Sequence, residues 1–308
     1  MHIFLWIIQL IIVPLCSPLV IGLTRTIKAR LQNRRGASPL QPYRDLWKLF
    51  HKGEVISADA SWIFRAAPFV IFTVTVAIAI SIPIFSLVTS NVWMSDLLVF
   101  VGPLALEAFV LALAGMDTGS PFGGFGSSRQ MMMVAFTEGG LVLSLCTLAF
   151  INHTTNLFTI SSQMLHGHFV SIASIILCAI AFGIAMLSET MRYPFDNPAT
   201  HLELTMIHEA MILEYSGPRL ALMEWAAANK YLIFIIISAN LFVPFGIASV
   251  TTFSALVIGV LVLVSKVVVV STGIAMLESS VAKLRIFRLP DLLFTSFILS
   301  VIAIGLAL

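Results

Sequence analysis

Several charged residues lie inside, or at the end of, apolar stretches that are long enough to be membrane helices: Glu107, Glu138, Lys266 and Glu278. A charged side chain at the centre of such a helix costs about 3 kcal/mol on insertion scales, so these residues usually face the bundle interior and mark ion or proton pathways. Burial favours the neutral form of a carboxyl or an amine, which suits a group that takes up and releases protons. Proton handling is therefore the leading interpretation. The alternative is structural pairing, in which Glu107 or Glu138 neutralises Lys266.

A second set of acids lies between two apolar stretches, in residues 188–229, where cations are few. These acids are Glu189, Asp196, Glu203, Glu209, Glu214 and Glu224. A net negative segment is poorly suited to anchoring on anionic lipid. Two interpretations stay open: a solvated acidic loop, and a chain of protonatable groups that dips toward the bilayer.

Membrane helices must position these residues. The 308 residues are 59% hydrophobic and only 10% charged, whereas soluble domains carry about 25% charged residues. A membrane helix needs about 20 mostly apolar residues, and the runs are continuous rather than alternating. The sequence therefore predicts an all-α integral membrane protein with eight transmembrane helices. The stretches are 3–23, 66–88, 97–116, 131–151, 169–187, 231–250, 253–276 and 291–308.

The positive charges predict the orientation, because lysine and arginine gather in cytoplasmic loops. With these eight spans, all but one of the 17 lysine and arginine residues fall in odd-numbered connections, and the exception is Lys266. Both termini are therefore expected outside. The first stretch has no lysine or arginine before its apolar core, so we expect a membrane helix there and not a cleaved signal peptide. The chain is predicted to be one polytopic domain, 1–308, with cytoplasmic segments at about 24–65, 117–130, 188–229 and 277–290.

The first cytoplasmic segment contains an amphipathic pattern. Tyr43, Leu46, Trp47 and Phe50 recur at helical spacing, with charged residues between them. This pattern predicts a short helix lying along the membrane interface. Such a helix either binds only lipid, or docks a soluble partner or forms the wall of a cavity.

No catalytic or metal motif stands out. Cys16, Cys146 and Cys178 are far apart and lack metal-ligand spacing. The glycine-rich run at 115–128 lacks the Gly-Lys-Ser/Thr ending of a phosphate loop, and we interpret it as a loop. His208-Glu209 begins a possible zinc helix, but Ile212 occupies the position of the second histidine. We therefore expect no catalytic centre, metal or redox cofactor in this chain.

Two segments carry a family resemblance. The first is ARLQNRRGASPLQPYRDLWKLFHKGEVI at 29–56, and the second is ETMRYPFDNPATHLELTMIHEAMILEYSGPRLALMEWA at 189–226. They resemble the family that unites mitochondrial subunit 1 of respiratory complex I, and its bacterial counterpart, with membrane subunits of group 4 [NiFe]-hydrogenases. The stretches HLELTMIHEAM and DTGSPFGGFGSSR look like the hydrogenase branch, and the likeness is greatest to the hydrogenase-4 and formate hydrogenlyase membrane anchor subunits.

The resemblance implies a non-catalytic membrane subunit that anchors a soluble electron-transfer module and couples it to proton or cation translocation. Glu138, Glu189, Glu203 and Glu214 match acids of the family's cytoplasmic loop and glutamate-lined path. Together with the intramembrane charges, the predicted proton path is Glu107, Glu138, Glu189, Asp196, Glu203, Glu209, Glu214, Lys266 and Glu278. The predicted partner interface is Arg25, Arg34, Arg35, Arg44, Arg285 and Arg288.

The resemblance also implies the partners. These are [NiFe]-hydrogenase large and small subunits, an iron–sulfur subunit and antiporter-like membrane subunits, in a bacterial or archaeal cytoplasmic membrane. The nickel–iron centre and iron–sulfur clusters would belong to those partners, and the hydrogenase branch gives no support to a quinone. Two alternatives remain: the quinone-binding membrane subunit of an NADH:quinone oxidoreductase, and a stand-alone secondary ion transporter.

Overall fold

A computed structural model of the chain describes residues 2–88, 94–165, 171–196, 206–250, 252–282 and 284–307, with side chains from residue 7 onward. Within these ranges the fold is all-helical, and no strand occurs apart from two isolated bridges. The helices are α1 His2–Leu31, α2 Gln41–Phe50, α3 Trp62–Ile78, α4 Leu97–Asp117, α5 Pro121–Asn152, α6 Leu157–Leu165, α7 Ile172–Glu189, α8 His208–Ile212, α9 Gly217–Phe242, α10 Phe253–Ser280, the short 3₁₀ helix η1 Ile286–Arg288 and α11 Leu289–Ala307. The prediction of an all-α membrane protein is confirmed.

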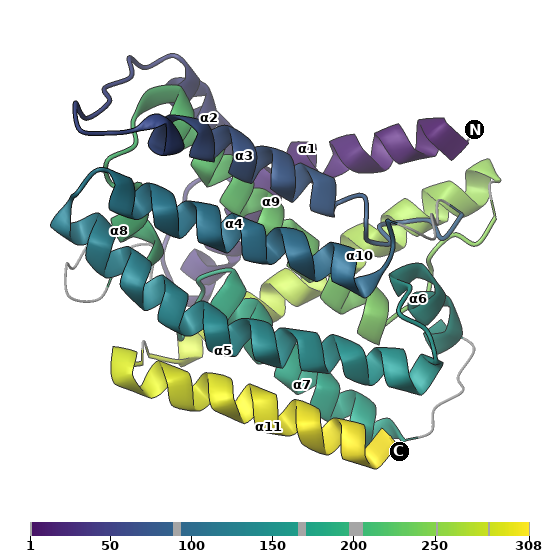
Figure 1. Cartoon of the computed structure of the whole chain (residues 1–308). Helices are drawn as coiled ribbons and strands as arrows, with labels where there is room; N and C mark the ends of the chain where they lie inside the picture. The colour runs from purple at the N-terminus through teal and green to yellow at the C-terminus, as the bar shows by residue number, and fades with distance from the viewer. Residues whose placement is uncertain are drawn as a thin grey trace.

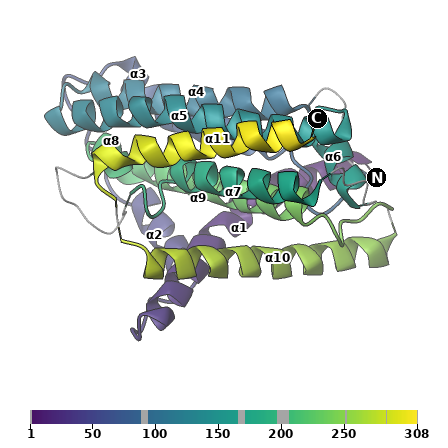
Figure 2. The same cartoon turned by 90° about the horizontal axis from the view of Figure 1, so that it is seen from below.

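Among the described residues, seven helices are long and apolar enough to cross a membrane: α1, α4, α5, α7, α9, α10 and α11 with η1. Helix α3 is also apolar but has 17 residues, slightly fewer than the roughly 20 that a straight crossing needs. The count of eight spans therefore stays a prediction. Both ends of the chain lie at the end of the bundle that carries α6, and α2 and α8 lie at the opposite end (Figures 1 and 2).

Two predicted spans were wrong at their boundaries, and in both a proline lies beyond the end of the helix within the apolar run. The stretch 66–88 was expected to be one helix, but α3 begins at its Ser61 cap and ends at Ile78, and the chain then turns before Pro83. The stretch 231–250 was expected to begin at Tyr231, but α9 begins at Gly217 and ends before Pro244. Proline disfavours the helical conformation in the residue before it and cannot donate the next helical hydrogen bond.

The loop predicted at 117–130 was also wrong, because α5 begins at Pro121. Its glycines are positions of close helix contact. A Cβ added at Gly123 would lie 2.0 Å from the Gly115 carbonyl oxygen of α4, and one at Gly126 would lie 2.9 Å from the Ala210 Cβ of α8. Small residues let membrane helices approach closely, and the same residues in a sequence favour a loop.

The other predicted cytoplasmic segments are shorter than expected for a related reason. Helix α1 continues to Leu31, α9 takes up the end of segment 188–229, and α10 continues to Ser280. In each case polar or charged residues belong to a helix that extends beyond its apolar run. The amphipathic helix is confirmed as α2, which buries Leu46 and leaves Trp47 69% exposed.

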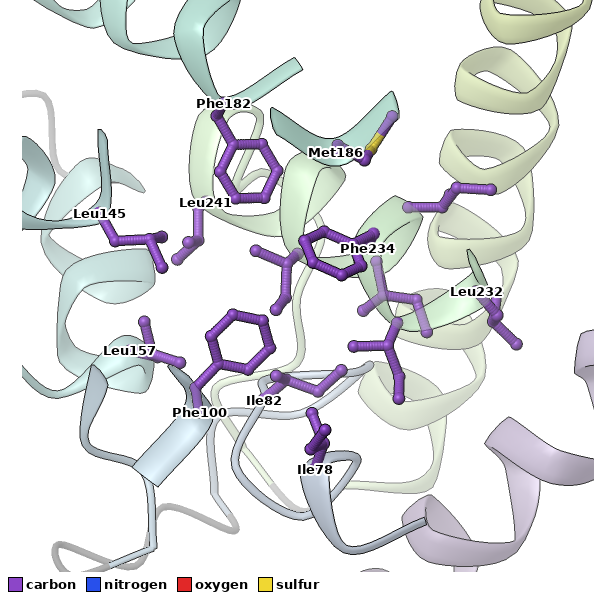
Figure 3. Packing of buried hydrophobic residues seen from close by; sticks show 14 of the residues in the cluster. Ile78, Ile82, Phe100, Leu145, Leu157, Phe182, Met186, Leu232, Phe234 and Leu241 are labelled. Carbon is purple, nitrogen blue, oxygen red and sulfur yellow. The ribbon is translucent and has the colours of Figure 1, made fainter. Parts of the chain in front are cut away.

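Helix α9 lies in the middle of the molecule and contacts α1, α2, α3, α6, α7 and α10 (Figures 1 and 2). Almost every side chain from Asn229 to Ile237 is buried. Phe234 projects into the core between Phe100 of α4 and Phe182 of α7, with ring centroids 6.1 Å away in both cases (Figure 3). This packing holds the polar residues of α9 at fixed positions inside an apolar core.

Candidate proton-transfer site

A buried ion-pair cluster joins three helices at the centre of the molecule. The Lys230 Nζ of α9 lies 3.1 Å from Glu107 Oε2 of α4 and 2.8 Å from Glu189 Oε2 of α7. All three residues are buried, with at most 6% of any of them exposed. When both carboxyls are ionised the cluster has one negative charge in excess, so it can bind a proton and still keep an ion pair with Lys230.

Lys230 is the functional residue that the sequence analysis missed. It was assigned to a cytoplasmic connection because the apolar run begins directly after it, at Tyr231. The structure instead places it about halfway along α9, which begins at Gly217-Pro218. Proline is favoured in the first turn of a helix, so Gly217-Pro218 was the available signal that the helix starts before the apolar run.

Glu138 borders this cluster from α5. Its side chain is half-buried and lies close enough to Glu189 and Lys230 to experience their charges. One residue earlier, the Thr137 hydroxyl contacts the Ser188 hydroxyl of α7 at 2.7 Å. The contact holds α5 against α7 one residue away from both Glu138 and Glu189, so Glu138 is the acid of α5 that lies near the buried cluster.

A second ion-pair cluster lies around Glu278 of α10. Glu278 Oε2 is 2.9 Å from Lys28 Nζ, and Glu278 Oε1 is 3.4 Å from Arg192 Nη1. The Arg192 guanidinium also lies 4.2 Å from the centre of the Tyr231 ring. Because Tyr231 follows Lys230 in α9, the two clusters meet on adjacent residues of the same helix.

Two internal cavities lead to these clusters. The outer cavity, of about 150 Å³, is bordered by α1, α2, α9 and the turn at Thr190–Arg192. The inner cavity, of about 50 Å³, contains Glu107, Glu189 and Lys230 in its wall. Both volumes are large enough for water, which needs about 10–15 Å³ and a few polar partners. Four residues belong to the walls of both cavities: Thr190, Met191, His208 and Ala227.

Residues just after α7 and at the start of α8 belong to the shared wall of the cavities. The Asp196 carboxylate accepts the backbone N–H groups of Ile207 at 3.2 Å and His208 at 3.3 Å, which holds the start of α8 against the turn. Burial lowers the pKa of His208 to about 4, although the nearby Asp196 charge opposes this shift. Burial also raises the pKa of the Tyr193 hydroxyl, with the charges of Glu278 and Asp196 adding to the effect.

Lys266 does not belong to either cluster. Its Nζ donates to the Asn240 side-chain oxygen at 3.1 Å, and Asn240 in turn donates to the carbonyls of Pro83 and Ile84. The structural pairing of Lys266 with Glu107 or Glu138 was therefore wrong, because Lys230 is the partner of Glu107. The reason is geometric: Lys266 lies near the chain turn that follows α3, close to the other end of α9.

The structure distributes the acids of segment 188–229 among different sites. Glu189 lies in the inner cavity, Glu209 and Asp196 border the outer one, and Glu214 is exposed and borders neither. Glu203 lies outside the described residues. Of the predicted path, the structure thus brings together Glu107, Glu138 and Glu189 at one site.

The arginines of the predicted interface are all exposed. They lie at the end of the bundle that carries α2 and α8, or in the connection to η1, and they are Arg25, Arg34, Arg35, Arg44, Arg285 and Arg288. Arg25 also borders the outer cavity. In the part of the chain that the structure describes, no group of three or more histidine, cysteine or acidic side chains is placed to hold a metal ion.

The comparison with known proteins decides the family. The family model described as NADH dehydrogenase matches residues 4–308. The chain belongs to this family. Among curated members, hydrogenase-4 component C of Escherichia coli K12 is 33% identical over 295 residues, which cover 96% of this chain and 92% of the relative. Formate hydrogenlyase subunit 4 of the same organism is 31% identical and covers 94% of each chain.

More distant members of the NADH dehydrogenase family match as well. NADH-quinone oxidoreductase subunit 8 of Rhodothermus marinus is 28% identical over 247 residues, which cover 74% of this chain and 69% of the relative. Among solved structures, a chain of the membrane-bound sulfane sulfur reductase, an archaeal respiratory membrane complex, superimposes with a TM-score of 0.83 at 20% identity over the whole of both chains. That likeness confirms the fold of this family member, and the family resemblance found in the sequence is confirmed by the relatives.

Proposed function

We propose that the chain is the membrane-anchor and coupling subunit of a membrane-bound [NiFe]-hydrogenase of the hydrogenase-4 or formate hydrogenlyase type. In this role it performs no redox chemistry itself. It links electron transfer in a soluble module to proton or cation translocation in the membrane. The two relatives with the highest identities among those described above carry these names and match nearly the full length of the chain.

The observation that carries the proposal is the Glu107–Lys230–Glu189 cluster beside two cavities that share wall residues. A purely structural ion pair needs one acid for one base. A second carboxyl at about 3 Å leaves an excess negative charge in a low-dielectric site, which costs free energy unless a proton is bound or a neighbouring charge responds. Such a site responds strongly to charge movements nearby, and this sensitivity is what a coupling subunit requires.

The proposed coupling runs from the soluble module to the cluster. A charge or conformational change at the α2–α8 end moves the turn 190–196 and the start of α8, which separate the cavities. That movement changes the water access and electrostatic field around Glu189. The excess negative charge then shifts between Glu189 and Glu107, and Glu138 passes the change to membrane subunits on the α5 side.

The proposed soluble partners dock at the same end. Six arginines are exposed there or at the η1 connection, while the acids Asp45, Asp196, Glu209 and Glu224 line the outer cavity. Exposed positive charges favour an acidic partner surface and steer its association. The partners expected on this basis are the hydrogenase large and small subunits and an iron–sulfur subunit, which would hold the nickel–iron centre and the clusters. Antiporter-like subunits would contact the chain within the membrane.

The assembly is tested by extracting the complex with a mild detergent through an affinity tag on this chain. The proposal expects a nickel-containing subunit pair with hydrogenase activity among the co-purifying polypeptides. An assembly that reduces quinone and contains no nickel would contradict it.

The coupling is tested separately with Glu138→Gln. The exchange removes one protonatable group from the half-buried position on α5, so proton translocation should fall while assembly and hydrogen turnover persist. Glu54→Gln is the matched control, because Glu54 pairs with Arg219 on the surface. Equal translocation in both variants would remove Glu138 from the path.

A second candidate is a quinone-binding subunit of an NADH:quinone oxidoreductase. The observation that favours it is the set of relatives named NADH-quinone oxidoreductase subunits. The outer cavity is lined by several ionisable side chains, among them Arg25, Asp45, Arg192 and Glu224, and these fit water better than an isoprenoid tail. Labelling of the purified complex by a photoreactive quinone at the outer cavity would favour this second candidate.

A further inference from the structure

Among the ionisable residues of the described chain, His208 is the one that lines both cavities. It is the first residue of α8, and its backbone N–H is held by the Asp196 carboxylate at 3.3 Å. Its side chain is only partly exposed, because it borders the two cavities and is otherwise surrounded by protein. The other residues shared by both walls are Thr190, Met191 and Ala227, and none of these titrates.

We propose that His208 is the proton-relay residue between the outer cavity and the Glu107–Lys230–Glu189 cluster. The inference rests on the proposed function, since a relay has a purpose only if the cluster exchanges protons. The inference adds to the proposed function by assigning the proton transfer between the two cavities to one side chain, which lies in the segment HLELTMIHEAM.

The chemistry requires a group with a donor on one side and an acceptor on the other. A neutral imidazole has one N–H and one unprotonated ring nitrogen. A hydronium ion in the outer cavity gives its excess proton to the unprotonated nitrogen and becomes neutral water. The opposite N–H gives its proton to a water in the inner cavity, which passes it to a carboxylate of the Glu107–Lys230–Glu189 cluster. One N–H bond forms and one breaks, the ring stays neutral overall, and a ring flip restores the starting tautomer.

The charges that face His208 suit a neutral relay. The charged residues that line the inner cavity with His208 are Glu107, Glu189 and Lys230, and those that line the outer cavity are Arg25, Asp45, Arg192, Asp196, Glu209 and Glu224. Burial keeps the pKa of His208 at about 4, well below its ordinary value, with the Lys230 charge contributing in the same direction and Asp196 opposing. The imidazole is therefore uncharged at neutral pH, so it conducts by concerted exchange and does not store a positive charge beside Lys230.

Three variants of the whole complex in proteoliposomes test the relay, with protons translocated per hydrogen turned over as the measurement. His208→Gln keeps a polar side chain of similar size but passes no proton, and translocation should fall at least tenfold while hydrogen turnover persists. Loss of an acid–base group typically costs about 10²–10⁴ in rate. His208→Ala should show the same loss and should recover when imidazole is added, because the deletion leaves a space beside the outer cavity. His51→Gln is the matched control, since His51 lies directly after α2, is exposed, and has its ring 4.4 Å from the Trp47 ring.

Glu107→Gln in parallel separates failure of the relay from failure of the proposed function. Wild-type translocation in His208→Gln, with loss in Glu107→Gln, overturns the relay and leaves coupling intact. Loss in His208→Gln without imidazole recovery of His208→Ala also overturns it, because a structural role would explain that pattern. Wild-type translocation in both Glu107→Gln and His208→Gln overturns the proposed function as well. Should His208→Ala not assemble, the His208→Gln result alone decides.

Discussion

At the scale of single residues, the charge balance around Lys230 decides what the centre of the molecule can do. One ammonium serves two carboxylates from different helices, at 3.1 and 2.8 Å. Deleting one member of a buried pair costs about 3–5 kcal/mol, because an uncompensated charge stays in a low dielectric. The lysine therefore contributes to stability as well as to the proposed proton transfer, and variants must separate these two roles.

Lys230→Met should destabilise the chain by about 3–5 kcal/mol, because Glu107 and Glu189 lose their shared cation. Adding Glu107→Gln and Glu189→Gln to Lys230→Met should restore most of the stability, since no buried charge remains, but should not restore proton translocation. Unfolding of the detergent-solubilised protein measures the stability of each variant. Proteoliposomes that contain the complete complex measure proton translocation. Equal stability of the single and triple variants would contradict the charge-balance argument.

His208 gives the chain a pH-dependent stability. Its pKa is lowered to about 4 in the folded protein, whereas an unfolded histidine titrates near about 6.5. As pH falls from about 6.5 to about 4, the unfolded state takes up a proton that the folded state does not, so this contribution to stability decreases, by at most about 1.4 kcal/mol per pH unit. The midpoint temperature of thermal unfolding should therefore change less with pH in His208→Gln than in the wild type over this range. The exposed-histidine control His51→Gln should keep the wild-type slope, and an unchanged slope in His208→Gln would contradict the argument.

The sequence identified the buried acids but not their partner. Glu107 and Glu138 lie within apolar runs, so they are visible as intramembrane charges. Lys230 lies at the edge of such a run, where a lysine is ordinarily assigned to a loop. Which cation meets which acid depends on the rotation and register of packed helices, and a single sequence carries no direct signal for either.

At the scale of elements, the tight contact of α4, α5 and α8 positions the acids of α4 and the start of α8. Gly123 of α5 faces the Gly115 carbonyl, while its neighbour Gly124 has open space around its Cα. The two adjacent glycines therefore separate the effect of helix contact from that of helix propensity.

Gly123→Ala should destabilise the protein by about 1–3 kcal/mol, the usual cost of overpacking, because its Cβ would lie 2.0 Å from a backbone oxygen. Gly124→Ala should be neutral or stabilising by up to about 1 kcal/mol, since alanine is the better helix former. Unfolding of both variants in the same detergent tests the difference. Equal destabilisation would show that helix contact at Gly123 is not the cause.

Helix existence was predictable and helix ends were not. Each apolar run overlaps one helix of the structure, because about 20 apolar residues have few alternatives in a membrane. The ends depend on local features that compete with hydropathy: Pro83 and Pro244 stop helices within apolar runs, and Gly217-Pro218 starts one among polar residues. The glycine-rich start of α5 was misassigned, since close helix contact and loop formation favour the same small residues.

At the scale of the whole molecule, the position of the termini tests the topology. Both ends of the chain lie at the α6 end, opposite α2 (Figure 1). An alkaline phosphatase fused after Leu308 should therefore be active outside the cytoplasmic membrane, whereas the same reporter fused after Lys52, beyond α2, should be inactive. Inactivity of the C-terminal fusion would mean an odd number of crossings and would exclude the predicted eight.

The whole molecule also explains why a chain with no evident catalytic motif keeps so many charges in its core. The outer cavity opens toward the end where the soluble partners are proposed to dock, and the inner cavity ends at the Glu107–Lys230–Glu189 cluster. The turn at 190–196 and the short helix α8 lie where the two cavities meet. A small movement of that turn can therefore change the protonation of a site at the centre of the bundle.

The most direct test of this account is the number of protons translocated per hydrogen turned over in proteoliposomes containing the complete complex with Glu107→Gln. The exchange leaves the Lys230–Glu189 pair intact, so the complex should assemble and turn over hydrogen, while proton translocation falls at least tenfold relative to wild type and to the surface control Glu54→Gln. Translocation at the wild-type ratio in an assembled Glu107→Gln complex would contradict the claim that these buried carboxyls carry the coupling.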